Sequence, residues 1–196
     1  EMSASLVGSE MCIRDSAETG LRGVLSTDND IPLYVIGNGA KGSAKWADKD
    51  ADEILADITG MMTQMARTTK KVEKPDTLAL PAEAYIILQN RRIDGTASNL
   101  LTYIQDNIKD IQNIVSCPEL DPDSVDTNPY AAEEDGKGVM LLFKNDARKL
   151  TIENPLPFIQ YPVQTQGLEM VVPCEARTAG AIIYYPMSLL IATGIC

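Results

Sequence analysis

Apolar residues recur at helical spacing between residues 50 and 67. The steps of one, three or four positions that place side chains on one helix face connect Ile54, Leu55, Ile58, Met61, Met62 and Met65. Asp50 and Glu53, three positions apart, form a capping signal at the start of this helix. Asp57 is expected on the opposite, polar face. Gly60 costs ~1 kcal/mol relative to alanine inside a helix, so we expect tertiary packing to support the helix there.

Shorter elements are predicted after this helix. They are a strand over residues 77–80, a helix over 82–90 with Pro81 in its first turn, a helix over 99–107 capped by Thr96 or Ser98, and strands over 111–117 and 138–144. The last of these strands contains an unbroken apolar run, which is typical of a strand buried on both faces.

The final part of the chain favours extended structure. Prolines keep residues 153–163 out of a helix. Residues 168–177 and 181–185 are then predicted to pair through a turn at residues 178–180, and Pro186 ends the second strand. Residues 20–47 are predicted to be mostly loop because five glycines interrupt them. The glycine pattern at 37–42 lacks the spacing of a phosphate-binding loop.

Composition removes several classes of function. The chain has 196 residues, 17 Lys and Arg against 28 Asp and Glu, a net charge of −11, and no histidine. The missing histidine excludes Ser-His-Asp and Cys-His catalysis and histidine-containing zinc sites within this sequence. The acidic balance argues against binding of nucleic acid through a basic surface. The apolar runs are all too short to cross a bilayer. The four cysteines form no CxxC pair, so reduced thiols are expected.

Two parts of the sequence contain residue types that could bind a metal or act in catalysis. Residues 118–136 are rich in acids and prolines, but their spacing does not match a calcium-binding loop, so we expect a solvated loop. Cys174 has no histidine partner and is expected to be a small apolar residue and not a nucleophile. An acidic metal-dependent enzyme that uses Asp and Glu ligands stays open as an alternative from another class.

The first sixteen residues differ from the rest. Residues 3–16 resemble the translation of a sequencing adapter, and residues 10–16 can be back-translated to the end of a transposase adapter. We therefore interpret residues 1–16 as non-native read-through that is not part of the fold. Under this interpretation the native sequence continues upstream of Ala17, and the chain is a C-terminal fragment.

Three motifs together resemble a known family. They are the stretch from Gly42 to Trp46 that leads into Asp52-Glu53-Ile54-Leu55, the motif Pro75-Asp76-Thr77-Leu78 with Leu80-Pro81, and the closing frame of Arg177, Gly180 and Pro186. This order is similar to the C-terminal two-thirds of the major capsid proteins of tailed phages. The match is to a family first catalogued as a domain of unknown function and now grouped with the HK97-fold capsid proteins.

The resemblance implies an α+β, HK97-like fold whose N-terminal arm and extended loop are missing here. It implies that residues 17–74 belong to a peripheral domain with a spine helix at 50–67, that residues 75–146 form an axial domain, and that residues 147–196 return to the sheet. Trp46, Pro75, Asp76, Pro81, Arg177, Gly180 and Pro186 are expected as structural hallmark positions. The resemblance implies no catalytic, cofactor-binding or metal-binding residues.

The implied function is a structural, non-enzymatic one. The subunit would form hexamers and pentamers of a phage shell in the host bacterial cytoplasm and become part of the virion. Scaffold, portal or decoration proteins are possible partners, whereas no cofactor, sequence-specific nucleic acid or membrane is expected. Within the same fold, an encapsulin-like compartment that packages a protein cargo is the alternative.

Overall fold

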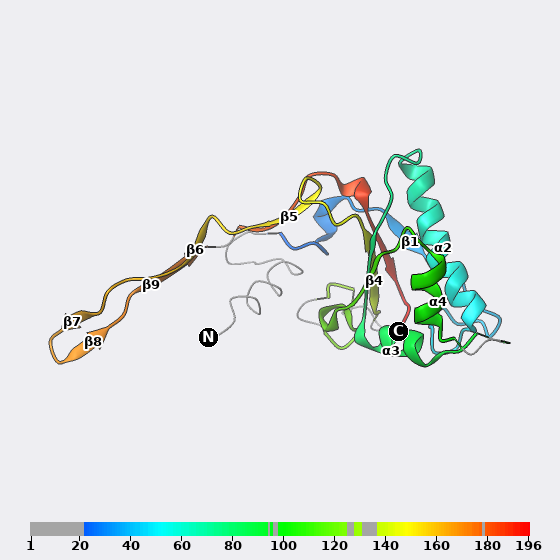
Figure 1. Ribbon diagram of the computed structural model, residues 1–196, viewed down its shortest axis with the longest axis horizontal. Helices are drawn as coiled ribbons and strands as arrows, with labels where there is room; N and C mark the ends of the chain where they lie inside the picture. The colour runs from blue at the N-terminus through cyan, green and yellow to red at the C-terminus, as the bar shows by residue number, and fades with distance from the viewer. Residues whose placement is uncertain (1–21, 94, 96–97, 125–127, 131–136, 178) are drawn as a thin grey trace.

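The computed structural model describes residues 22–93, 95, 98–124, 128–130, 137–177 and 179–196. The adapter-like segment at 1–16 lies outside the described residues, as do Thr96 and the most acidic part of the loop at 118–136. Two parts can be distinguished in Figure 1: a compact body of sheet and helices, and a long two-stranded arm that projects from it.

A five-stranded mixed sheet forms the centre of the body. Its order is β1 (Leu33–Val35), β11 (Leu189–Thr193), β4 (Val139–Phe143), β2 (Thr77–Leu80) and β3 (Asn113–Ser116). Strand β4 pairs antiparallel with both of its neighbours, and each edge strand is parallel to the strand beside it. The predicted buried strand at 138–144 is confirmed: β4 is covered on both faces, as its unbroken apolar run requires.

Alternate side chains of the three inner strands enter two different cores. Leu78, Leu142 and Leu190 belong to the larger core, whereas their sequence neighbours Ala79, Leu141 and Leu189 belong to the smaller core on the other face. The larger core contains residues of α2 (Ala51–Thr68), α3 (Ala82–Asn90) and α4 (Leu100–Asn107). The helices therefore cover one face of the sheet, as the period of two along each strand dictates.

The predicted helices are confirmed, with one difference in the cap of α4. Helix α2 begins after Asp50, whose capping box with Glu53 is present. Helix α4 begins after Asn99, whose side chain accepts a hydrogen bond from the Thr102 N–H, so the predicted cap at Ser98 is wrong by one residue. Single turns of 3₁₀ helix occur at η1 (Thr27–Asn29), η2 (Pro118–Leu120) and η3 (Pro186–Ser188).

The predicted boundary between residues 74 and 75 does not coincide with a boundary in the packing. Ile58 and Met65 of α2 lie in the same core as Leu78 of β2 and Leu142 of β4. Helix α2 and the sheet are therefore one body, because they share one buried apolar core. The assignment of the names peripheral and axial to parts of this chain stays a prediction.

The arm consists of three consecutive strand pairs. These are β5 (Leu150–Glu153) with β10 (Gly180–Ile183), β6 (Leu156–Gln160) with β9 (Cys174–Arg177), and β7 (Gln164–Gln166) with β8 (Glu169–Val171). The predicted pairing of residues 168–177 with 181–185 is wrong. The ribbon reverses at Gly167, which has a φ of +67°, and not at residues 178–180. Of the segment 147–196, only β11 joins the five-stranded sheet.

No described helix is long and apolar enough to cross a membrane.

Candidate functional site: the arm, its root and the body

A buried ionic centre joins the loop before α2 to that helix. Trp46 is completely buried, and its indole Nε1–H donates a hydrogen bond to Oδ2 of Asp57 at 3.1 Å. The Lys49 ammonium lies 2.7 Å from the same oxygen and also donates to the Gly37 carbonyl at 2.6 Å. Asp57 is therefore buried and paired, so its predicted place on a polar, solvent-facing side of the helix is wrong.

Arg91 holds the loop of this centre from outside. Its guanidinium donates to the carbonyl oxygens of Lys49, Trp46 and Ala47 at 2.5, 3.2 and 3.0 Å. The Trp46 N–H in turn donates to the Ile195 carbonyl at 2.8 Å. The loop is thereby fixed both to the end of α3 and to the segment that follows β11. Of these residues only Trp46 was singled out from the sequence.

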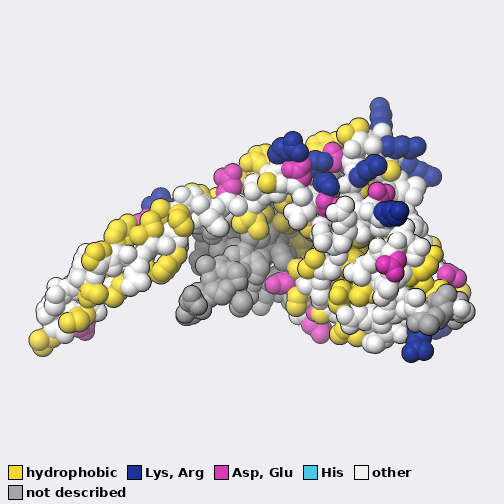
Figure 2. Space-filling model, in the orientation of Figure 1, with side chains coloured by type: hydrophobic (Ala, Val, Ile, Leu, Met, Phe, Trp, Pro, Cys, Tyr) yellow, Lys and Arg dark blue, Asp and Glu magenta, His cyan; other side chains and the backbone are white. Residues whose placement is uncertain are grey.

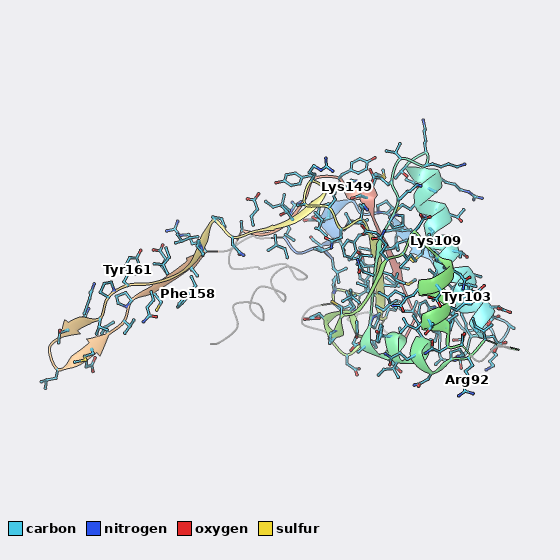
Figure 3. The ribbon with its side chains drawn as sticks, in the orientation of Figure 1. Arg92, Tyr103, Lys109, Lys149, Phe158 and Tyr161 are labelled. Carbon is cyan, nitrogen blue, oxygen red and sulfur yellow. The ribbon has the colours of Figure 1, made fainter. Side chains whose placement is uncertain are left out.

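The root of the arm is held by a second ionic cluster. Asp76 accepts hydrogen bonds from the Lys144 ammonium at 2.6 Å, the Asn145 N–H at 2.8 Å and the Thr77 hydroxyl at 2.9 Å. The buried Glu73 pairs with Lys149, which lies where the chain leaves the body for the arm (Figure 3). The cluster connects the strand pair β2–β4 to β5, so it orients the base of the arm.

The pKa shifts in this cluster favour the charged forms. Burial would raise the pKa of Asp76, but the hydrogen bonds from Asn145, Lys144 and Thr77 outweigh it and lower the pKa below its ordinary value of 3.8. The same pair raises the pKa of Lys144. Hydrogen bonds from Arg148 lower the pKa of Asp146 to about 2. Asp76, Lys144 and Asp146 therefore stay ionised at neutral pH, and ion pairs hold the root of the arm.

The two predicted prolines of the second motif lie at the ends of strand β2. Pro75 and Pro81 are both buried. Pro81 is the N-cap residue of α3 and not its first helical residue, and it offers no side-chain cap. Asp121, which directly follows η2, supplies the cap instead, because its Oδ1 accepts a hydrogen bond from the Ala82 N–H at 2.7 Å. The start of the acidic loop therefore has a structural task in the body.

The third predicted motif, Arg177, Gly180 and Pro186, lies in the part of the chain that leads from the arm back to the body. Arg177 is exposed on β9 and pairs with Glu175 at 3.2 Å. Gly180 begins β10 with a φ of +77°, and Pro186 opens η3 before β11. The structure does not bring these three residues together with Trp46 and Asp76 in one site. That all seven positions are family hallmarks stays a prediction.

The arm is exposed and almost uncharged. Glu169 is the only Asp, Glu, Lys or Arg between residues 154 and 174, in a chain of which 23% of residues are charged. Large apolar side chains are exposed along the arm, namely Phe158, Ile159, Tyr161, Val163, Leu168, Met170 and Val172. Figure 2 shows these yellow side chains along the ribbon, and Figure 3 places Phe158 and Tyr161 far from the body. Such a composition is typical of the core of a protein interface.

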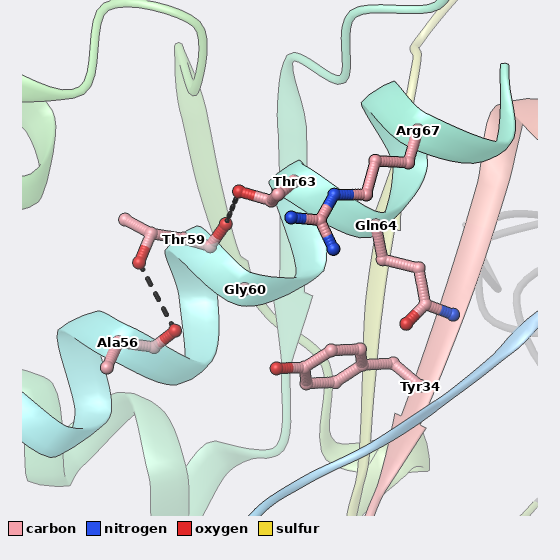
Figure 4. A pocket seen from close by; sticks show the side chains of 7 residues that line it. All are labelled: Tyr34, Ala56, Thr59, Gly60, Thr63, Gln64 and Arg67. Carbon is pink, nitrogen blue, oxygen red and sulfur yellow. Dashed lines mark hydrogen bonds between the residues drawn. The ribbon is translucent and has the colours of Figure 1, made fainter. Parts of the chain in front are cut away.

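A groove lies on the outer face of helix α2 (Figure 4). It has a volume of about 520 Å³ and is lined by Tyr34, Ala56, Thr59, Gly60, Thr63, Gln64 and Arg67. The Tyr34 hydroxyl lies over Gly60, where an added Cβ would stand only 2.2 Å from it. This contact is the tertiary packing that was expected at Gly60, and desolvation by burial, with the charge of Asp57, raises the pKa of Tyr34.

The cysteines and carboxylates of the described residues form no reactive or metal-binding group. Cys117, Cys174 and Cys196 are free thiols. Burial is the main cause that raises the pKa of Cys117 to about 11 and that of Cys196 to about 12. Both thiols are therefore protonated at neutral pH. Within the described part of the chain, no group of three or more Cys, Asp or Glu side chains is arranged to hold a metal ion.

Comparison with solved structures defines the class of fold. The capsid of Myoviridae phage XM1 matches with a TM-score of 0.74 and 15% identity, covering 97% of this chain and 60% of that one. A virus-like particle from Pyrococcus furiosus matches with a TM-score of 0.59 and 14% identity, covering 94% and 61%. The predicted α+β, HK97-like capsid fold is thus confirmed, in a chain that spans about three fifths of either structure's chain.

A family model described as "Major capsid protein" matches residues 10–195. The chain belongs to the major capsid protein family. The match begins inside the segment 1–16, and the origin of that segment stays a prediction. A sequence search of the curated proteins finds no match.

Proposed function

We propose that the full-length protein is the major capsid subunit of a tailed bacteriophage and self-assembles into the icosahedral shell that encloses the genome. In this proposal the subunits form hexamers and pentamers, assemble in the host bacterial cytoplasm and become part of the virion. The role is structural, as the family and the fold indicate.

The observation that carries the proposal is the exposed arm, in which Glu169 is the only charged residue between residues 154 and 174. A two-stranded ribbon is at best marginally stable in water, because it has too few neighbours to bury its apolar side chains. Phe158 is 63% exposed and Met170 is 81% exposed in the single chain. Burial of such side chains against neighbouring subunits would stabilise both the ribbon and the contact at roughly 25 cal/mol per Å² of apolar surface. The arm therefore supports a chain that completes its fold by assembly.

The ionic root gives this arm a defined direction. Lys144 pairs with Asp76 and Lys149 pairs with Glu73. These pairs lie just before β5, the first strand of the arm, and η3 follows β10, its last strand. An arm that must reach the same place on each neighbour benefits from a fixed base. The proposal assigns no catalytic task to these charges.

A compartment shell of the encapsulin type is the second candidate within this fold. The similarity to a virus-like particle from Pyrococcus furiosus favours it, although this match covers less of the chain with a lower TM-score than the phage capsid does. Genes beside the coding sequence distinguish the two. Portal and terminase genes support the phage shell, and a gene for a peroxidase or ferritin-like cargo supports the compartment.

The proposal is tested by assembly of the full-length protein encoded by the reading frame that contains this chain. We expect electron microscopy to show closed shells, if necessary after co-expression with the scaffold protein of the same gene cluster. As a control, a variant in which a short Gly-Asn-Gly turn replaces residues 154–176 should keep the fluorescence of the buried Trp46 in the body and form no shells. Only monomers of the unaltered protein, with scaffold supplied, would refute the proposal.

A further inference from the structure

Two charged side chains stand without a partner at opposite ends of the molecule. Arg67 lines the groove on α2, and Glu169 begins β8 at the tip of the arm. Neither side chain has a hydrogen bond or an ion pair with any described residue. Arg67 is the only charged residue that lines the groove. Glu169 is the only charged residue between residues 154 and 174 of the arm. The two surfaces therefore carry single, opposite charges.

The tip of the arm has the form of an apolar knob. Leu168 follows Gly167 in the turn between β7 and β8 and is fully exposed, with a relative accessibility of 105%. Met170 is 81% exposed two residues later. An exposed leucine at the apex of a hairpin presents its whole side chain to a partner, and the carboxylate of Glu169 comes directly after it.

The groove is suited to receive such a knob. The Tyr34 hydroxyl covers Gly60, and the Tyr34 ring forms one wall of the groove. The Thr59 and Thr63 hydroxyls already donate to the carbonyl oxygens of Leu55 and Thr59 at 2.9 and 2.8 Å, so an apolar side chain leaves neither hydroxyl proton unpaired. Figure 4 shows the Arg67 guanidinium and the Tyr34 ring on the same side of the helix.

One copy cannot bring its own tip to its own groove. In Figure 1 the tip, at β7 and β8, lies at one end of the molecule, and α2 lies at the far side of the body. A contact between the two surfaces must therefore join two copies. Because the surfaces differ, the contact is heterologous and repeats from copy to copy, as a closed ring of subunits requires.

We infer that the arm tip of one subunit docks into the α2 groove of another copy, with Leu168 against the Tyr34 ring and the Glu169 carboxylate paired with the Arg67 guanidinium. This inference rests on the proposed function and names the partner surface of the arm. The partner is a second copy of this chain. The pair of Glu169 and Arg67 would determine how the tip sits in the groove, because two like charges at these positions would repel each other.

A charge exchange in the full-length protein tests the docking. We expect R67E alone or E169R alone to lower the yield of closed shells by about tenfold or more, because each places like charges together. The double variant R67E/E169R restores the opposite pair and should return the yield to within about twofold of the unaltered protein. K70E, which makes the same charge change on an exposed lysine just beyond the helix, is the matched control and should have little effect.

A cross-link checks the contact without relying on charge. A photoreactive p-benzoylphenylalanine in place of Leu168 should link to residues 56–67 of another copy in assembled shells, as located by mass spectrometry. Links from position 168 to another arm, or single variants that assemble normally, would overturn the docking while the proposed shell function stands. Absence of shells from the unaltered protein would instead refute the proposed function itself.

Discussion

Replacement of Asp57 by alanine tests the buried ionic centre directly. The Asp57 side chain is 10% exposed, and that of Lys49, whose ammonium lies 2.7 Å from it, is 2% exposed. In D57A the Lys49 ammonium keeps only the Gly37 carbonyl, and the Trp46 indole N–H loses the only side-chain acceptor that it has among the described residues. The change therefore removes the carboxylate that the buried Lys49 ammonium and the buried Trp46 N–H share.

The magnitude follows from the cost of an unpaired buried charge. Removal of one partner of a buried ion pair costs ~3–5 kcal/mol of unfolding free energy. The unsatisfied Trp46 N–H belongs to the same network, so its cost of ~1–3 kcal/mol does not simply add. We expect D57A to lose about 4 kcal/mol, a large fraction of the ~5–15 kcal/mol typical of a folded domain.

Urea denaturation followed by tryptophan fluorescence measures this loss. Trp46 is the only tryptophan and is fully buried beside Asp57, so its emission reports the unfolding of the body without a label. D52A is the matched control: Asp52 is exposed in the first turn of the same helix, and its loss should cost less than about 1 kcal/mol.

A second variant separates the charge from the packing. K49M removes the buried cation but keeps an apolar stem of similar length, so D57A/K49M should be more stable than D57A alone. A loss below about 1 kcal/mol in D57A, or no recovery in the double variant, would refute the assignment of Lys49 and Asp57 as a buried pair that supports the body.

Two further predictions concern single carboxylates. D121A should lower the unfolding free energy by about 1 kcal/mol, because Asp121 caps α3 in place of a side chain at Pro81, whereas the neighbouring D123A should have little effect; equal effects in urea denaturation would contradict this role. The hydrogen bonds that lower the pKa of Asp76 contribute stability that is present above the ordinary pKa of 3.8 and is lost as the pH falls below it toward the folded-state pKa. The stability difference between the unaltered protein and D76N should therefore be large at pH 7 and shrink below about pH 4, and a difference that stays constant with pH would refute it.

Local patterns predicted the elements of the body well. The stripe from Ile54 to Met65 fixed the position of α2, and the apolar run from Val139 identified a strand buried on both faces. These signals are strong because the burial of one face or of both faces leaves a direct trace in the order of residues.

The buried ionic centre left no such trace. Asp57 occupies a polar position of the helical pattern, and Lys49 stands eight residues earlier in a charged stretch. In the sequence both residues are typical of a solvent-exposed surface. They are buried only because the loop from residue 37 to residue 49 packs over the helix. The closure depends on Arg91, which is distant in sequence, so no local pattern could identify it.

Strand pairing in the arm could not be read from propensity alone. Gly167 and Gly180 both have positive φ values, but only Gly167 lies in a turn that reverses the chain. The register also shifts between Leu156 and Ile159, which breaks a simple alternation of faces. Because the arm beyond β5 and β10 is mostly exposed on both faces, the usual apolar signal of register is weak there.

The arm is an insertion between two neighbouring strands. β4 and β11 pair with Val139 opposite Thr193 and Phe143 opposite Leu189, and the arm leaves after one strand and returns before the other. The Lys144 N–H donates to the Ser188 carbonyl at 3.3 Å, so the two ends of the insertion are held together by the body. Each doubling of a flexible connection costs only about 0.6 kcal/mol in closure entropy. The reach of the subunit can therefore lengthen or shorten at the tip, by natural drift or by design, while the core that folds beneath it stays the same.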